Sequence, residues 1–285
     1  MSIKQVENIF DPQAPHFVGD GFRVHNFIPS KVSMEYMNPF IMLDYNSKFV
    51  FTPSETPRGV GAHPHRGFET VTIAYKGKVE HRDSSGSGGV ISDGDVQWMT
   101  AASGVLHKEF HETEWSKNGG EFHMVQLWVN LPAQYKMSSP RYQAIANSDM
   151  PRVTLKDGYV EIIAGEYAGE RGKAKTFSPV NLFNLKLKEG GEAEFKFPAE
   201  YVTALLVLEG DVEVNGQTVN ENQFAVFKKE GDEFTVSAKR DALVLIMSAE
   251  HIDEPVAAYG PFVMNTEEEI QQAFEDFHNG KFGNL

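Results

Sequence analysis

Two short stretches of the chain place metal-capable side chains two residues apart. The first holds His63 and His65, and the second holds His107 and Glu109. Residues i and i+2 of a β-strand point to the same face, so each pair can converge on one point. If the stretches lie on facing strands of one barrel, they enclose a single ion.

The ligand types limit which metal ions the site can bind. Three imidazoles and one carboxylate suit a divalent iron, nickel, copper, zinc or manganese ion. They fill four positions of an octahedron and leave two open. The pattern therefore predicts a site with room for a substrate or dioxygen. Its carboxylate, Glu109, is also the best candidate for a catalytic base.

Composition indicates a globular protein and argues against some partners. The chain has 285 residues, 41% hydrophobic and 23% charged, with a net charge of −14. This charge disfavours direct nucleic-acid binding, which needs a basic face. Cysteine is absent, so disulfides, thiolate metal ligands and thiol nucleophiles are excluded.

The chain shows no sign of a membrane or secretory segment. Residues 1–10 lack an apolar core of signal-peptide length, and the run over residues 242–247 is too short to span a bilayer. We therefore expect a cytoplasmic protein without membrane contact. We also expect a monomer, because two similar halves can cover each other.

The elements that carry the candidate residues read as strands. Residues 69–75 and 96–99 are rich in β-forming residues, and residues 122–130 alternate between two faces. Turn signals recur at short intervals, which is typical of a sandwich or a closed barrel. The sequence thus predicts an all-β fold.

The two halves of the chain repeat one pattern. Residues 71–80 and 204–213 both read as an apolar strand, a glycine, a charged residue, Val and Glu. A polar, proline-containing stretch over residues 131–157 separates the halves. We therefore predict a metal-binding domain at 1–135 and a second domain at 136–285. The second half holds only His251 and His278, so we expect it to lack the ion.

The end of the chain predicts a short helix. Thr266 and Glu269 have the spacing of a capping box. The apolar residues that follow recur at helical spacing, at Ile270, Ala273, Phe274 and Phe277. We assign this helix a packing role.

Longer sequence motifs of the chain resemble those of one known family. The run from His63 to Glu69 (HPHRGFE) and the run from Gln97 to Ala101 (QWMTA) are similar to those of the pirin family, a branch of the cupins. The likeness spans nearly the whole chain. It implies a bicupin of two antiparallel β-barrels face to face, with one iron in the N-terminal barrel. The family's ligands fall on His63, His65, His107 and Glu109.

The resemblance supports two functions. Some members show quercetin 2,3-dioxygenase activity, which implies a flavonol-like substrate, O₂ and Glu109 as both ligand and base. The vertebrate member is a nuclear transcriptional co-regulator, so the alternative is a metal-containing regulatory protein that acts on a protein partner without turnover. A purely structural metal site is a third interpretation.

Other residues near the motifs have simpler interpretations. His111 continues the face of His107 and Glu109, and we expect a polar residue beyond the barrel rim, with a rival metal ligand or a donor that orients Glu109 as the alternatives. Glu69 matches a ligand of ordinary cupins and is a candidate partner of a histidine. We interpret the other histidines, His81 included, as surface or core residues.

Overall fold

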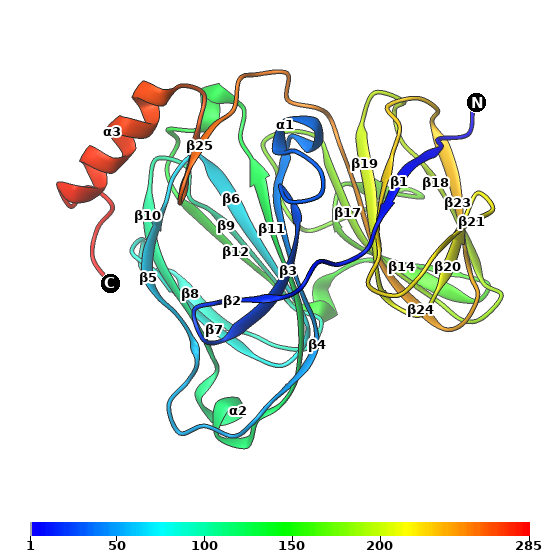
Figure 1. Cartoon of the computed structure of the whole chain (residues 1–285), viewed down its shortest axis with the longest axis horizontal. Helices are drawn as coiled ribbons and strands as arrows, with labels where there is room; N and C mark the ends of the chain where they lie inside the picture. The colour runs from blue at the N-terminus through cyan, green and yellow to red at the C-terminus, as the bar shows by residue number, and fades with distance from the viewer. Residues whose placement is uncertain (1) are drawn as a thin grey trace. The chain divides into compact units, whose positions relative to one another are not determined.

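The computed structural model describes residues 2–285, which form two compact units built mainly from antiparallel strands (Figure 1). The larger unit comprises Ala14–Asn147 and Ile252–Leu285. The smaller unit comprises the chain up to Gln13 and Ser148–His251. The all-β prediction is confirmed. The division at residue 135 differs from these units because each end of the chain joins the unit built by the opposite half.

The larger unit contains a seven-stranded sheet and a four-stranded sheet. The first has the order β12-β9-β6-β11-β4-β3-β2, with bounds β2 (His16–Val18), β3 (Phe22–Ile28), β4 (Phe40–Phe51), β6 (Phe68–Lys76), β9 (Val96–Thr100), β11 (Gly120–Asn130) and β12 (Arg141–Ile145). The second has the order β5-β10-β7-β8, with bounds β5 (Gly59–His65), β7 (Val79–Asp83), β8 (Gly88–Ile91) and β10 (Val105–His111). Short helices complete it: α1 (Met34–Met37), α2 (Thr113–Asn118) and η1 (Ala133–Tyr135).

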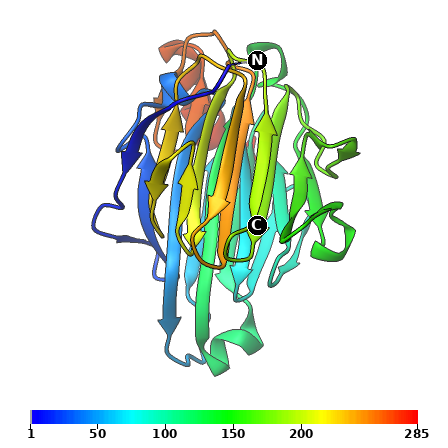
Figure 2. The ribbon, with the colours of Figure 1, turned by 90° about the vertical axis from the view of Figure 1, so that its right-hand side faces the viewer.

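The smaller unit repeats this plan. Its seven-stranded sheet, β1-β22-β19-β24-β17-β14-β13, contains β1 (Val6–Phe10), β13 (Arg152–Leu155), β14 (Gly158–Ala164), β17 (Val180–Leu187), β19 (Val202–Glu209), β22 (Phe224–Phe227) and β24 (Ala242–Ala249). Its four-stranded sheet, β18-β23-β20-β21, contains β18 (Glu192–Lys196), β20 (Val212–Val214), β21 (Gln217–Val219) and β23 (Glu233–Ala238). A small hairpin, β15 (Glu166–Tyr167) and β16 (Glu170–Arg171), and the turn η2 (Asn147–Asp149) complete the middle of the chain. Figure 2 shows strands of this unit side by side, coloured from yellow-green to orange.

The two strand orders correspond one to one, as the predicted duplication requires. The strand order around β5 and β10 matches the order around β18 and β23. Within residues 2–285 the sheets of each unit remain separate, so they do not close into the continuous barrels that were expected. Aromatic side chains fill the smaller unit, where Phe195, Phe227 and Phe234 belong to one buried cluster.

Local sequence explains the turns. Asn215 and Gly216 connect β20 to β21 with φ angles of 48° and 84°. A two-residue hairpin turn of this kind needs positive φ at both positions, which Asn and Gly adopt most readily. The Asn-Gly pair therefore fixes the register of this hairpin.

The C-terminal helix forms as predicted but belongs to the larger unit. Helix α3 (Glu267–His278) begins with a complete capping box between Thr266 and Glu269. Its buried residues Ile270 and Ala273 pack with Leu106 of β10 and with the strand pair β25 (Ala257–Tyr259) and β26 (Phe262–Met264). Figure 1 shows α3, in red, beside β10 and β25. The helix therefore packs on the sheet that carries the metal-capable residues.

None of the helices within residues 2–285 is long and apolar enough to cross a membrane.

A buried lysine ties three segments of the larger unit together. Lys136 is 1% exposed, and burial lowers its pKa to about 7. Its Nζ donates to the carbonyl oxygens of Gly67 and Val263, at 2.8 and 3.0 Å, and to Oδ1 of Asn130 at 2.5 Å. One amine thus joins the turn after β5, the end of β11 and strand β26.

Replacing Lys136 by Met should destabilise the protein. The change leaves three buried oxygens without their donor, and one such group costs about 1–3 kcal/mol. We expect the free energy of unfolding in urea to fall by about 3 kcal/mol. Lys117→Met, at an exposed ion pair with Glu114, is the matched control and should leave stability nearly unchanged. Equal effects of the two changes would contradict this role.

Candidate metal centre

The two metal-capable stretches lie on neighbouring strands of one sheet. Strands β5 and β10 pair antiparallel, with His63 opposite His107 and Val105 opposite His65. They were expected on facing strands, but direct pairing serves the same purpose because alternate residues of both strands share one face. The pairing shifts between His107 and Glu109, where Glu109 lies opposite Val60.

Three histidines come together at this face. The candidate ligand atoms of His63, His65 and His107 lie within 4.8 Å of one another. Their ring centroids are 4.2 to 4.8 Å apart. His65 and His107 are 3% and 0% exposed, whereas His63 is half-buried. The three side chains could therefore hold one ion that is reached from the side of His63.

Hydrogen bonds select the nitrogen that each ring can offer. Nδ1 of His63 lies 2.8 Å from the carbonyl oxygen of Gly61, and Nδ1 of His65 lies 3.3 Å from that of Pro261. A carbonyl oxygen only accepts, so Nδ1 carries the proton and Nε2 keeps its lone pair. Among residues 2–285, the buried Nε2 of His107 has no hydrogen-bond partner. All three rings therefore have an Nε2 suited to a metal.

The electrostatics fit this use. Burial lowers the pKa of both His65 and His107 well below the ordinary histidine range, and the neighbouring histidines lower it further. Both rings are therefore neutral at pH 7. A metal ligand must be unprotonated at the binding nitrogen. The unpartnered buried Nε2 of His107, next to the neutral ring of His65, thus fits a divalent ion.

Glu109 lies close to only part of this cluster. Its carboxylate is grouped with His81 and His107, with ligand atoms within 4.8 Å, rather than with His63 and His65. Glu109 is 5% exposed, and Thr72 Oγ1 donates to it at 3.4 Å. The four predicted residues thus fall, together with His81, into two groups of three that share His107.

A cavity of about 340 Å³ opens beside these residues, and His63, His65 and Glu109 line it. Most of its wall is apolar, including Phe22, Val24, Val60, Met42, Met124 and Trp128. Its polar groups away from the histidines are Asp44 and Gln126. Burial raises the pKa of Asp44, and Asn26 Nδ2 donates to it at 2.8 Å. An apolar wall with few polar groups is typical of a small-molecule site.

The C-terminal segment supports the turn that carries His65. Beyond the contact of Pro261 with His65, the backbone N–H of Val263 donates to Arg66 at 3.0 Å. The guanidinium of Arg66 is buried, lies 2.9 Å from Asp276 of α3, and donates to Ser103 at 2.7 Å. Hydrogen bonds from Lys281 and Arg66 lower the pKa of Asp276 to about 2. Residues about 200 positions away thus hold one candidate ligand in place.

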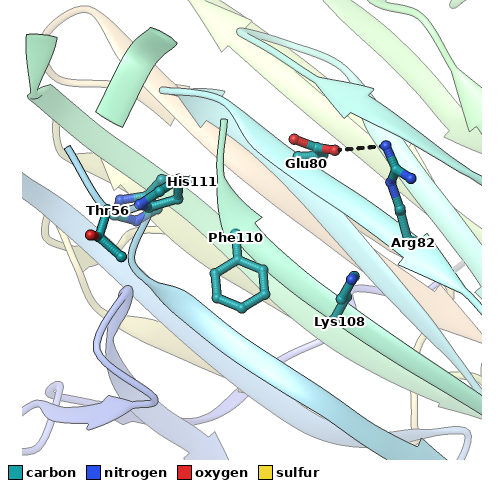
Figure 3. Close-up of a pocket in the computed structure, with 7 residues that line it drawn as sticks. Thr56, Glu80, Arg82, Lys108, Phe110 and His111 are labelled. Atoms are coloured by element: carbon teal, nitrogen blue, oxygen red, sulfur yellow. Dashed lines mark ion pairs between the residues drawn. The ribbon is translucent and has the colours of Figure 1, made fainter. Parts of the chain in front are cut away.

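The other face of β10 has a different character. Lys108 and Phe110 alternate with the candidate ligands and line a separate hollow of about 360 Å³ (Figure 3). Figure 3 shows them beside the ion pair of Glu80 and Arg82, whose atoms are 3.4 Å apart. These outward residues do not belong to the metal-capable face.

One expectation about nearby histidines was wrong, and a second histidine lies closer to the candidate ligands than its core assignment indicated. His111 is 1% exposed rather than beyond a rim, its Nε2 donates to Gly21 at 2.8 Å, and it packs in an aromatic cluster with Phe51 and Phe122. His81, interpreted as an ordinary core or surface residue, lies next to His107, with 3.4 Å between their Nδ1 atoms. The sequence signal that could have pointed to His81 is its spacing from Asp83, since the two residues are two positions apart on β7.

Two models of known protein families match the chain. The Pirin family model matches residues 21–129, and that of the pirin C-terminal cupin domain matches residues 182–283. The chain belongs to the pirin family. The bicupin fold that the resemblance implied is confirmed, as is the short C-terminal helix.

Individual relatives match over almost their full length. A protein of Pseudomonas aeruginosa named "Putative quercetin 2,3-dioxygenase" is 46% identical over 282 residues, which are 98% of this chain and 99% of that one. Pirin-1 of Arabidopsis thaliana is 37% identical over 272 residues, 93% of this chain and 90% of that one. A crystal structure of quercetin 2,3-dioxygenase from Acinetobacter baumannii superimposes with a TM-score of 0.95 at 46% identity and covers 99% of both chains.

Glu69 lies on the face of β6 that points away from the candidate metal ligands. Its neighbour at i+3, Thr72, contacts Glu109, whereas Glu69 accepts from Thr100 at 2.7 Å and lies 3.8 Å from Arg141. These contacts do not include the histidine partner that was a candidate for it. Burial raises the pKa of Glu69 from 4.5 to about 7.

This shift predicts a pH-dependent stability. Between pH 4.5 and about 7 the unfolded chain ionises Glu69 while the folded chain keeps it protonated, so stability falls as pH rises. The shift corresponds to about 3 kcal/mol. Denaturant melts across this range should show a flatter profile for Glu69→Gln. Glu268→Gln, at an exposed position, should keep the wild-type profile, and a wild-type slope in Glu69→Gln would contradict the assignment.

Proposed function

We propose that this chain is a metal-dependent dioxygenase that opens flavonol-type substrates with O₂. The observation that carries the proposal is a largely apolar cavity of about 340 Å³ lined by His63, His65 and Glu109. The names of two relatives with 46% identity support the same class of reaction. The proposed ligands are His63, His65 and His107 through Nε2, with Glu109 as the fourth.

The proposed ion is Fe(II), as the family resemblance implies, although this donor set also accepts nickel, copper, manganese or zinc. When bound, a divalent ion would stabilise the deprotonated, electron-rich form of an acidic enol that reacts with O₂. A dioxygenase incorporates both oxygen atoms into the substrate, so no external reductant is required.

The chain's own residues have distinct parts in this scheme. Glu109 Oε1, which lies 3.4 Å from the hydroxyl of Thr72, would accept the proton of the substrate hydroxyl. Walls such as Phe22, Met124 and Trp128 would enclose flat aromatic rings and exclude water. Asp44 and Gln126 would receive hydroxyl groups of the substrate, since they are the cavity's other polar groups.

The direct test is aerobic turnover of quercetin by protein reconstituted separately with Fe(II), Ni(II), Cu(II), Mn(II) or Zn(II). We expect metal-dependent loss of substrate, followed by absorbance, and none with His63→Ala. The regulatory alternative predicts another outcome: no turnover with any ion despite full occupancy of the site. That result would contradict the enzyme proposal and direct attention to a protein partner.

A second test concerns the proton acceptor. Glu109→Gln keeps the size and a ligand oxygen but removes the basic carboxylate. We expect the turnover number to fall roughly 10²–10⁴-fold, the contribution of a positioned general base. The metal content of the variant is the control. Unchanged turnover with the metal retained would remove Glu109 as the base.

A further inference from the structure

The three candidate histidines are anchored in two different ways. Nδ1 of His63 and Nδ1 of His65 each contact a backbone carbonyl oxygen. Nδ1 of His107 instead lies 3.4 Å from Nδ1 of His81, a side chain on the neighbouring strand β7. Metal-bound histidines generally need a partner at their other nitrogen, which fixes the tautomer and the ring orientation. His81 occupies that position for His107.

The proton count assigns a role to each nitrogen. If His107 offers Nε2 to an ion, its proton is on Nδ1, which then donates. Nδ1 of His81 must accept, and it does so for a second donor as well, because Nε2 of Gln97 lies 3.1 Å away. The proton of His81 is therefore on Nε2. The carboxylate of Asp83 lies on that side, with Oδ2 at 3.9 Å. This separation is beyond hydrogen-bond distance, and within residues 2–285 the buried Nε2 of His81 has no hydrogen-bond partner.

The surroundings hold His81 in this orientation. Oδ1 of Asp83 accepts from Ser85 N, Ser85 Oγ and Ser87 N at 2.9, 2.6 and 3.1 Å, which fixes the carboxylate. The ring of His81 stacks on Tyr142, with centroids 5.4 Å apart and planes 13° apart. His81 and His107 are 1% and 0% exposed, so water does not replace these contacts.

We propose that His81 is a positioning residue that accepts a hydrogen bond from Nδ1 of His107 and directs Nε2 of His107 to the ion. The inference rests on the metal site proposed above but not on turnover. A ligand role for His81 fits less well. His81 does group with His107 and Glu109 at metal-binding distance. With its proton on Nε2, however, its one lone pair is on Nδ1 and already faces Gln97 and His107.

Two substitutions of His81 separate the roles. His81→Phe keeps a flat ring against Tyr142 but removes the acceptor. His81→Asn places an amide oxygen near the position of Nδ1 and restores it. The measurements are Co(II) affinity, by competition with a chelator, and the visible absorption of bound Co(II), which reports the arrangement of its ligands. Neither depends on substrate.

We expect His81→Phe to bind one Co(II) per chain about 10- to 100-fold more weakly, the usual effect of losing such a partner. Its Co(II) spectrum should change, and His81→Asn should restore both properties. His123→Phe is the matched control, since His123 is equally buried but bonds to Tyr45. It should keep the wild-type affinity and spectrum even if it is less stable.

Three results would overturn the proposal. Wild-type affinity and spectrum in His81→Phe would show that the contact is irrelevant, and loss of the ion from both His81 variants would make His81 a ligand. An ion-free wild-type protein would instead reject the underlying site, whereas an ion-loaded but inactive one would reject only the dioxygenase. If His81→Phe does not fold, Asp83→Asn serves as the second variant and should shift the spectrum in the same direction.

Discussion

The antiparallel pairing of β5 with β10 is the constraint on which the candidate site depends. Backbone hydrogen bonds place His63 opposite His107, and the alternation of side chains adds His65 and Glu109 to the same face. No long loop has to be ordered to bring these residues together. The smaller unit has the same pair of strands, β18 and β23, but Lys196 ends β18 and no histidine lies on either strand. The corresponding strands of the smaller unit therefore lack the candidate ligands.

A second layer of contacts makes this pairing specific. Carbonyl oxygens anchor two imidazoles, and a third imidazole faces His81. The C-terminal segment supplies one of these anchors and holds the adjacent Arg66 through Asp276. The last residues of the chain are thus part of the site's support. Helix α3, to which we assigned only a packing role, therefore also supports the site, because its apolar face packs on the strand that carries His107.

Local patterns predicted what depends on local geometry. The spacing of His63 and His65 predicts a strand, and the capping box at Thr266 predicts the start of a helix. Each prediction needs only the residues of one element, and the structure shows both elements. The exchange of chain ends could not be predicted this way, because the pairing of β1 with β22 joins residues more than 200 positions apart. His81 was missed for the same reason: its importance comes from its neighbour across β7 and β10, not from its own motif. The bulge that separates Glu109 from His63 is likewise a property of paired strands.

We infer that one ion is held by three Nε2 atoms at the face shared by β5 and β10. The most direct measurement is a crystal structure of the metal-loaded protein with anomalous diffraction collected at the edge of the bound metal. We predict a single peak about 2 Å from Nε2 of His63, His65 and His107, the usual distance for a metal–imidazole bond. A peak bonded to His81 rather than to His63 and His65 would contradict this account, as would a peak away from β5 and β10.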